Sequence, residues 1–267
     1  MKKYWIIPLL LCLLLTGCSR NEDGETTAPT QPMDPPSAQT KTVYVRREST
    51  SQNGDTVTRT RYVFDDANQV CRVLTFTDQV QTQEYTVECD SNGNYILWTS
   101  GDSQIRYAYD DGGNLVSYGA YMGETLISAT AYTWENGLRT EIRRTVQGAE
   151  HRTAMTYDEK GCLIRQDNYA NGELTDYSVY TLGADGKPVT QSLYLADGTL
   201  SQTISYTYAG STVKAVSSDG SFSEQSYDEF GNLLSDTQYD AQGNMISRQT
   251  HSWMAIEVPL NSLRASI

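Results

Sequence analysis

Residues 225–253 read QSYDEFGNLLSDTQYDAQGNMISRQTHSW, and they decide the fold because they contain one short pattern twice. The two copies are residues 227–233 and 239–245. Each begins with an aromatic residue, continues through Asp and Gly, and returns to an apolar residue. Tyrosine suits a pleated surface, Asp accepts hydrogen bonds from its own backbone, and Gly adopts positive φ. The pattern therefore predicts a strand, a turn and a second strand.

Looser copies of this unit fill the chain from residue 42 onward. Asn-Gly and Asp-Gly pairs, which are typical of tight hairpins, are separated by segments rich in Thr, Tyr, Val, Ile and Ser. Tyrosines recur every 22 to 25 residues at Tyr62, Tyr85, Tyr107, Tyr132, Tyr157 and Tyr180. Two strands per period predict an all-β antiparallel meander of tandem β-hairpin repeats, with about sixteen or more strands.

Sheets of more than about ten strands usually curl or close. We therefore expect a long, curled or partly closed sheet over residues 41–252, with a β-sandwich as the alternative. Residues 253–267 are expected to form a C-terminal cap or tail over the last strand, because an open edge invites aggregation.

The composition favours wide, half-hydrated sheets over a thick aliphatic core. Hydrophobic residues make up 38%, and the chain has 19 tyrosines but only 4 phenylalanines. The formal net charge is −13. Nucleic acid repels such a chain, so the sequence predicts no nucleic-acid partner.

The N-terminus has the features of an export signal. Lys2 and Lys3 precede an apolar segment at residues 4–15, which is short for a membrane span. The segment ends in Leu15-Thr16-Gly17-Cys18, which resembles the lipobox of bacterial lipoprotein signal peptides. The resemblance implies removal of residues 1–17, lipidation of Cys18, and a protein anchored to the membrane outside the cytoplasm. Removing both lysines leaves 18 basic and 33 acidic residues, a net charge of −15.

Residues 18–40 contain the lipidated cysteine and a linker. The linker includes four of the seven prolines and almost no apolar residues, which predicts a disordered spacer.

The repeats resemble a known family. Residues 109–115, 157–163, 227–233 and 239–245 are similar to the YD repeat of bacterial RHS-type wall-associated proteins. The shorter units at residues 171–174 and 197–200 are similar to MORN-type hairpins. The resemblance covers most of residues 60–250 and implies a β-hairpin array in a cell-surface setting.

The sequence predicts no catalytic residue, metal site or cofactor. His151 and His251 stand far apart, with no Cys or His at ligand spacing around either. Acidic pairs are frequent, and a carboxylate pair is what a glycoside hydrolase needs. However, these pairs recur at the turn of each repeat, which favours a structural role: Asp65-Asp66, Asp110-Asp111, Asp158-Glu159 and Asp228-Glu229.

Three cysteines follow Cys18. A loop centred on Val80 would place Cys71 opposite Cys89 on paired strands, and an extracytoplasmic location permits a disulfide. The alternative is two half-buried thiols. Cys162 occupies a position where other repeats have Asn, and we interpret it as an incidental substitution.

Tyr109, Tyr157, Tyr227 and Tyr239 are the candidate ligand-binding residues. A row of tyrosines could stack against sugar rings or hold a peptide, or it could pair across strands and stabilise the sheet. The sequence therefore favours a lipid-anchored, non-enzymatic module that binds a cell-envelope polysaccharide or protein, or serves as a spacer. A lipid-anchored glycan hydrolase is the alternative, and an assembly factor presenting sheet edges is a third hypothesis.

Overall fold

The computed structural model describes residues 40–259, which form eighteen β-strands. The strands are β1 (Thr40–Asn53), β2 (Thr56–Phe64), β3 (Val70–Thr77), β4 (Val80–Cys89), β5 (Tyr95–Ser100), β6 (Ser103–Tyr109), β7 (Leu115–Met122), β8 (Thr125–Glu135), β9 (Leu138–Val146), β10 (Ala149–Tyr157), β11 (Leu163–Ala170), β12 (Glu173–Leu182), β13 (Pro188–Leu195), β14 (Leu200–Ala209), β15 (Thr212–Ser217), β16 (Phe222–Tyr227), β17 (Leu233–Tyr239) and β18 (Met245–Pro259). The predicted signal peptide, the lipidation site at Cys18 and residues 19–39 of the linker lie outside the described residues.

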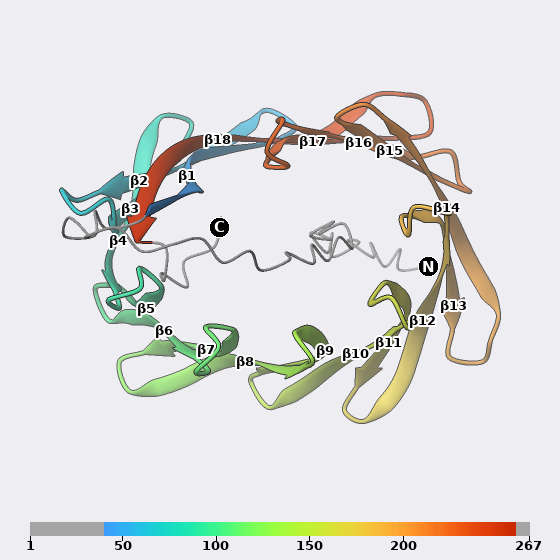
Figure 1. Cartoon of the computed structure of the whole chain (residues 1–267), viewed down its shortest axis with the longest axis horizontal. Coiled ribbons are helices and arrows are strands. Elements are labelled where there is room, and N and C mark those ends of the chain that lie inside the picture. The colour runs from blue at the N-terminus through green and yellow to red at the C-terminus, as the bar shows by residue number, and fades with distance from the viewer. Residues whose placement is uncertain (1–39, 260–267) are drawn as a thin grey trace, which may run out of the picture.

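All eighteen strands belong to one continuous sheet. Each strand pairs antiparallel with the next one along the chain, and β1 also pairs with β18. This closing pair runs from Thr40 opposite Pro259 to Asn53 opposite Ser247, with one bulge between Arg46 and Glu48. Viewed end-on, the strands follow an elongated closed ring in which β1 lies beside β18 (Figure 1). The fold is therefore a closed antiparallel β-barrel.

The closure of the sheet overturns two predictions made from the sequence. The all-β antiparallel meander is confirmed, but the sheet is neither partly closed nor split into a sandwich, because its first and last strands are hydrogen-bonded to each other. Residues 253–267 were expected to form a cap or tail; residues 253–259 instead continue β18 and pair with β1, and residues 260–267 lie outside the described residues. Both corrections have one cause. Pairing the two end strands removes both unpaired edges, so no cap is required.

The turns divide between the two ends of the barrel, because successive hairpins point in opposite directions. At the end that contains the β2–β3 turn, a five-residue loop built on Asp recurs. In one copy Asp110 Oδ1 accepts the backbone N–H of Asn114 at 2.8 Å, while Asp110 N donates to Asn114 O at 3.0 Å. Gly113 in this loop has φ +80°, which glycine adopts without strain. The repeated Asp-x-x-Gly pattern thus forms a repeated turn.

Alternation along the strands separates the two faces of the ring. In β4, Tyr85 and Val87 are shielded, whereas Glu84 and Thr86 are exposed. Side chains on the inner face of a closed ring converge and cover one another. We therefore assign the shielded set to the inside of the barrel and the exposed set to the outside.

The fully buried apolar core is small. Among the described residues it comprises a cluster at the closing pair, a cluster on β3 and β4, and two further buried residues: Val43, Val45 and Ile256; Val70, Val73 and Val87; and Met155 and Tyr180. Phe64 packs against both clusters. The rest of the inner face combines half-buried tyrosines with buried polar residues such as Thr130, Ser178 and Asp236. Residues 40–259 contain no helix long and apolar enough to cross a membrane.

Candidate functional site

The paired carboxylates lie in the turns. Asp65 Oδ1 accepts two backbone N–H groups, from Ala67 at 2.9 Å and Gln69 at 2.8 Å. Hydrogen bonds from Asn114 hold the pKa of the Asp110 carboxyl below its ordinary value. The first carboxylate of such a pair is therefore engaged by its own loop.

A ladder of aromatic rings lines part of the inner face. Neighbouring rings have centroids 5.7 to 6.3 Å apart, within the range of favourable aromatic pairs. The ladder runs through Tyr85, Trp98, Tyr107, Tyr118 and Tyr132. Burial raises the pKa of Tyr107 well above its ordinary value. These rings occupy the space that aliphatic residues fill in a conventional core.

The four candidate tyrosines do not form one surface. Tyr109, Tyr157 and Tyr227 lie on the inner face, and Tyr239 lies on the outer face. The Tyr157 hydroxyl donates to Arg139 O at 2.7 Å and that of Tyr227 to Gln225 Oε1 at 2.8 Å. Burial raises the pKa of Tyr109 to about 12. The three inner tyrosines thus have contacts within the barrel wall, and a ligand role for them stays a prediction.

Tyr239 belongs to a different feature, an outer row of cations and aromatic rings. The Tyr239 ring stacks on Phe222 with centroids 4.5 Å apart, and Lys214 Nζ lies 4.0 Å from the centre of the Phe222 ring. Tyr177 is likewise stacked on Tyr194, at 4.9 Å. The remaining cation–ring pairs of the outer row are Arg165 over Tyr177 at 4.2 Å, Arg152 over Tyr169 at 3.8 Å, Arg106 over Tyr121 at 4.5 Å and Arg61 over Phe76 at 5.9 Å.

The outer row lies near one end of the barrel. All aromatic residues of the outer row except Tyr177 lie within three positions of a turn that follows an odd-numbered strand. These residues are Phe76, Tyr121, Tyr169, Tyr194, Phe222 and Tyr239. Since these hairpins all point the same way, the rings share one end of the outer wall. The row combines phenol hydroxyls, ring edges and cations, which together can hydrogen-bond and pack against a sugar chain.

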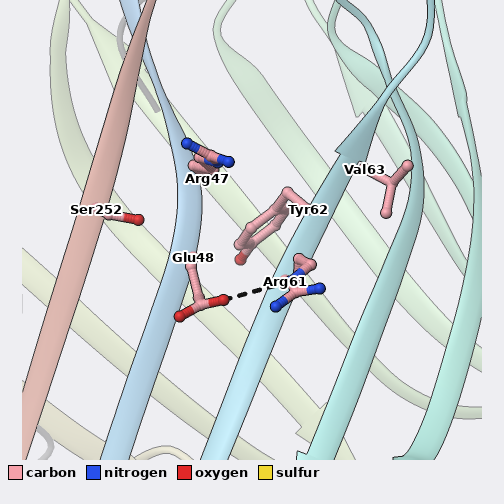
Figure 2. Close-up of a pocket in the computed structure, with 6 residues that line it drawn as sticks. All are labelled: Arg47, Glu48, Arg61, Tyr62, Val63 and Ser252. Atoms are coloured by element: carbon pink, nitrogen blue, oxygen red, sulfur yellow. Dashed lines mark hydrogen bonds and ion pairs between the residues drawn. The ribbon is translucent and has the colours of Figure 1, made fainter.

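A hollow on the outer wall adjoins the closing pair of strands. It has a volume of about 460 Å³ and is lined by residues of β18, β1 and β2: Arg47, Glu48, Arg61, Tyr62, Val63 and Ser252. Figure 2 shows the three neighbouring strands, with Glu48 of β1 reaching toward Arg61 of β2. Arg47 is the extra residue of the β1 bulge. Bulges commonly redirect a side chain, and the Arg47 side chain lines this hollow.

Glu48 links Arg61 of this hollow to the neighbouring Arg59 on β2. Its two carboxylate oxygens lie 3.3 Å from Arg61 Nε and 3.6 Å from Arg59 Nε. All three side chains are substantially exposed, so the ion pairs contribute little to stability. Their effect is to hold two guanidinium groups side by side at the surface.

The expected disulfide between Cys71 and Cys89 is not formed. The β3–β4 turn centres on Asp78 and Gln79 rather than on Val80, and the one-residue bulge between Thr75 and Phe76 makes up only part of that difference. As a result Cys89 lies out of register with Cys71. The Cys71 thiol donates to Val63 O at 3.4 Å, and the Cys89 thiol to Val70 O at 3.7 Å.

Two buried titratable groups lie near the closing pair. Burial, and secondarily the charge of Arg46, lowers the pKa of His251 to about 4. Burial raises the pKa of Asp236, whose Oδ2 accepts a hydrogen bond from Gln225 at 3.1 Å. Among residues 40–259, no three His, Cys, Asp or Glu side chains lie close enough together to hold a metal ion.

Sequence reasoning missed the outer cations and the hollow. The aromatic residues two positions before short turns, such as Phe76, Tyr121 and Tyr169, could have been found from their spacing. Their cationic neighbours depend on strand register and bulges, which the sequence does not show. The hollow joins residues more than 180 positions apart, so it depends on closure.

The comparisons with known proteins are limited. A family model described as "Uncharacterised protein" matches residues 89–214, and no curated protein matches the chain. Among solved structures, the chain is similar to a porin-like protein from Bacteroides uniformis, with 8% identity, a TM-score of 0.43, and coverage of 78% of this chain and 95% of the other. A porin-like protein from Bacteroides vulgatus gives 10% identity, a TM-score of 0.36, and coverage of 79% and 98%.

Part of a much larger protein is also similar. The structure entitled TcdB2-TccC3-Cdc42 matches with 15% identity, a TM-score of 0.32, and coverage of 68% of this chain. The chain spans only 12% of that protein's length.

Proposed function

We propose that this protein is a non-enzymatic binding module, lipid-anchored through Cys18 outside the cytoplasm, and that its outer row binds a cell-envelope polysaccharide. The lipobox resemblance supports the anchor. The 22-residue linker behind Cys18 could extend to about 70 Å, which would hold the barrel away from the membrane surface.

The observation that carries the binding role is the outer row itself. Cations lie over aromatic rings at five places around the wall, at 3.8 to 5.9 Å from the ring centres. A repeating surface of this kind suits a repeating ligand, because each sugar unit can meet an equivalent set of groups. Rings held in place by stacking lose little conformational freedom on binding.

The hydrolase alternative has less support. It requires two carboxyl groups placed across a sugar bond, one of them with a raised pKa. The acidic pairs lie in turns, where hydrogen bonds from the loop lower the pKa of the Asp110 carboxyl. The carboxyl with a raised pKa, Asp236, lies instead in the middle of a strand.

Binding by the outer row can be tested with the full-length protein and isolated cell-wall glycans. Tyr194→Ala and Tyr239→Ala should weaken saturable glycan binding at least fivefold, while circular dichroism shows an unchanged fold. Tyr118→Ala, on the inner ladder, is the matched control and should lower the melting temperature with less effect on affinity. A folded protein that retains no glycan would favour a spacer role over the proposal.

The anchor can be tested by metabolic labelling in a bacterial host with radioactive palmitate. The wild-type chain should take up label and fractionate with membranes. Cys18→Ser should remain unlabelled and unprocessed. Equal labelling of both chains would contradict lipidation at Cys18.

A further inference from the structure

A second hollow extends the one at the closing pair. It has a volume of about 590 Å³ and is lined by Val57, Arg59, Arg61, Phe76, Asp78 and Gln79. Both hollows include Arg61. We name the two together the seam groove, which crosses the outer wall from β18 to β3.

The seam groove is rich in cationic groups for a chain of net charge −13. Arg47, Arg59 and Arg61 line it, and the carboxylates that face them are Glu48 and Asp78. Asp78 Oδ1 already accepts the backbone N–H of Val57 at 3.0 Å. The groove therefore keeps an excess of positive charge.

The arginines also have donors to spare. Each guanidinium carries five N–H groups, and Glu48 contacts Arg59 and Arg61 through their Nε atoms. One carboxylate cannot satisfy two arginines. Since about half of each of these side chains is exposed, at 48% and 50%, their remaining donors face the groove or solvent.

Apolar groups complete the lining. Val57, Val63 and Phe76 line the groove, and the Arg61 guanidinium lies 5.9 Å from the centre of the Phe76 ring. Guanidinium groups beside an aromatic ring and aliphatic side chains suit a ligand that alternates anionic groups with sugar rings.

We propose that the seam groove binds an acidic glycan, through carboxylate or phosphate groups held by Arg47, Arg59 and Arg61. That the ligand is a glycan rests on the proposed glycan-binding function. That the glycan is acidic rests on the arginines of the groove. An anionic polymer is otherwise repelled by this acidic protein, so attraction must come from a local cluster of cations.

The test measures binding of the full-length protein to polygalacturonate and to phosphomannan. Methyl-esterified polygalacturonate and neutral mannan are the uncharged counterparts. We expect saturable binding to at least one charged polymer, at least tenfold weaker binding to its uncharged counterpart, and weaker binding as salt rises. The charged polymer that binds more tightly identifies the anionic group as carboxylate or phosphate.

Variants then locate the site. Arg47→Gln and Arg61→Gln should each weaken binding to the charged polymer at least fivefold, and Arg61→Lys should retain part of the affinity. Arg144→Gln, which removes the same charge from an exposed residue of β9, should change affinity less than twofold. Equal losses in all the Gln variants, or no binding to either charged polymer, would overturn the proposal.

The outcome is separable from that of the outer row. Tyr194 belongs to the outer row and not to the groove, and Arg47 belongs to the groove and not to the row, so Arg47→Gln should weaken binding to the charged polymer more than Tyr194→Ala does. Loss of polyanion binding in Tyr194→Ala, with Arg47→Gln unaffected, would assign the binding to the row and reject the groove.

Discussion

Tyr227 and Tyr239 begin two copies of the same pattern, yet they lie on opposite faces of the barrel. Tyr227 pairs with Leu233, and Ser226 pairs with Ser235, so Leu234 has no partner in the ladder. An extra residue in a strand reverses the face of every residue after it. One bulge therefore converts the second tyrosine from an inner contact to a member of the outer row.

Tyr157 should contribute to stability through its hydroxyl. The hydroxyl donates to Arg139 O at 2.7 Å, and a net contribution of about 1 kcal/mol is typical of such a bond. Tyr157→Phe should lower the free energy of unfolding by about that amount in urea titrations. Tyr239→Phe keeps the ring that stacks on Phe222, so it should change the free energy of unfolding by less than about 0.5 kcal/mol. Equal effects of the two variants would contradict this assignment.

His251 should make the barrel less stable in acid. Its pKa is about 4 in the folded chain and 6.5 in the unfolded chain, so the unfolded chain binds the proton first as pH falls. The stabilisation is complete above pH 6.5 and is lost between pH 6.5 and 4. Because the group is only partly buried, we expect a loss of about 1–2 kcal/mol over that window.

The matched comparison for His251 is His251→Gln, measured by urea unfolding at pH 7.5, 5.5 and 4.5. The variant should show a flatter profile than the wild type. Asp236, with its raised pKa, acts in the opposite direction but is present in both chains. Parallel profiles would show that His251 does not titrate with the fold.

At the scale of the element, the five-residue Asp loop recurs at both ends of the barrel, because Asp110 begins one after β6 and Asp240 begins one after β17. It recurs where the sequence pattern is weak, because Asp65 and Asp90 accept the same backbone hydrogen bonds as Asp110 and Asp228. Even the loop that begins with Gly183 keeps the backbone hydrogen bond, from Gly183 N to Lys187 O at 2.8 Å. The backbone geometry is thus more regular than the sequence.

The conformation of this loop can be tested by a substitution at Gly231. It has φ +83°, and no atom lies within 4 Å of where a Cβ would stand. Gly231→Ala should therefore cost about 1 kcal/mol of stability through backbone strain alone, measured by thermal or urea unfolding. Glu229→Ala, an exposed change in the same loop, should be nearly neutral. An unchanged stability in Gly231→Ala would mean that the loop adopts another conformation.

At the scale of the whole molecule, closure determines which residues meet. The β1–β18 pair places the Val43 and Val45 side chains against Ile256 and brings Ser252 beside Arg47. An open sheet of the same strands would separate its ends by about 80 Å at 4.8 Å per strand. The apolar cluster at the closing pair would then not exist, and the first hollow of the seam groove would lose the wall that Ser252 supplies.

Closure can be tested with a cross-link. Thr50 lies opposite Thr250, so Thr50→Cys combined with Thr250→Cys should form an intramolecular disulfide under mild oxidation. Cys71, Cys89 and Cys162 are replaced by Ser in this chain. Mass spectrometry of the unreduced digest should show the linked peptides, and thiol titration should find both introduced thiols consumed. Thr50→Cys with Thr145→Cys, on β9, should remain reduced.

The sequence by itself determined the fold class and the turns. Local rules suffice for these, because Asp and Gly act on their own backbone and alternation acts within one strand. Residues 109–115 and 157–163 form the predicted loops for that reason. The composition, rich in tyrosine and poor in phenylalanine, also predicted half-buried tyrosines in place of a thick aliphatic core.

Only the tertiary structure decided the closure, the face of each aromatic residue and the seam groove. The sheet closes only if β1 meets β18. Whether they meet depends on the twist and stagger accumulated over all eighteen strands. The facing of Tyr239 and the register of Cys71 and Cys89 depend on bulges, each a shift of one residue. Such shifts leave the local pattern intact, so the sequence predicts the strands but not the contacts between distant ones.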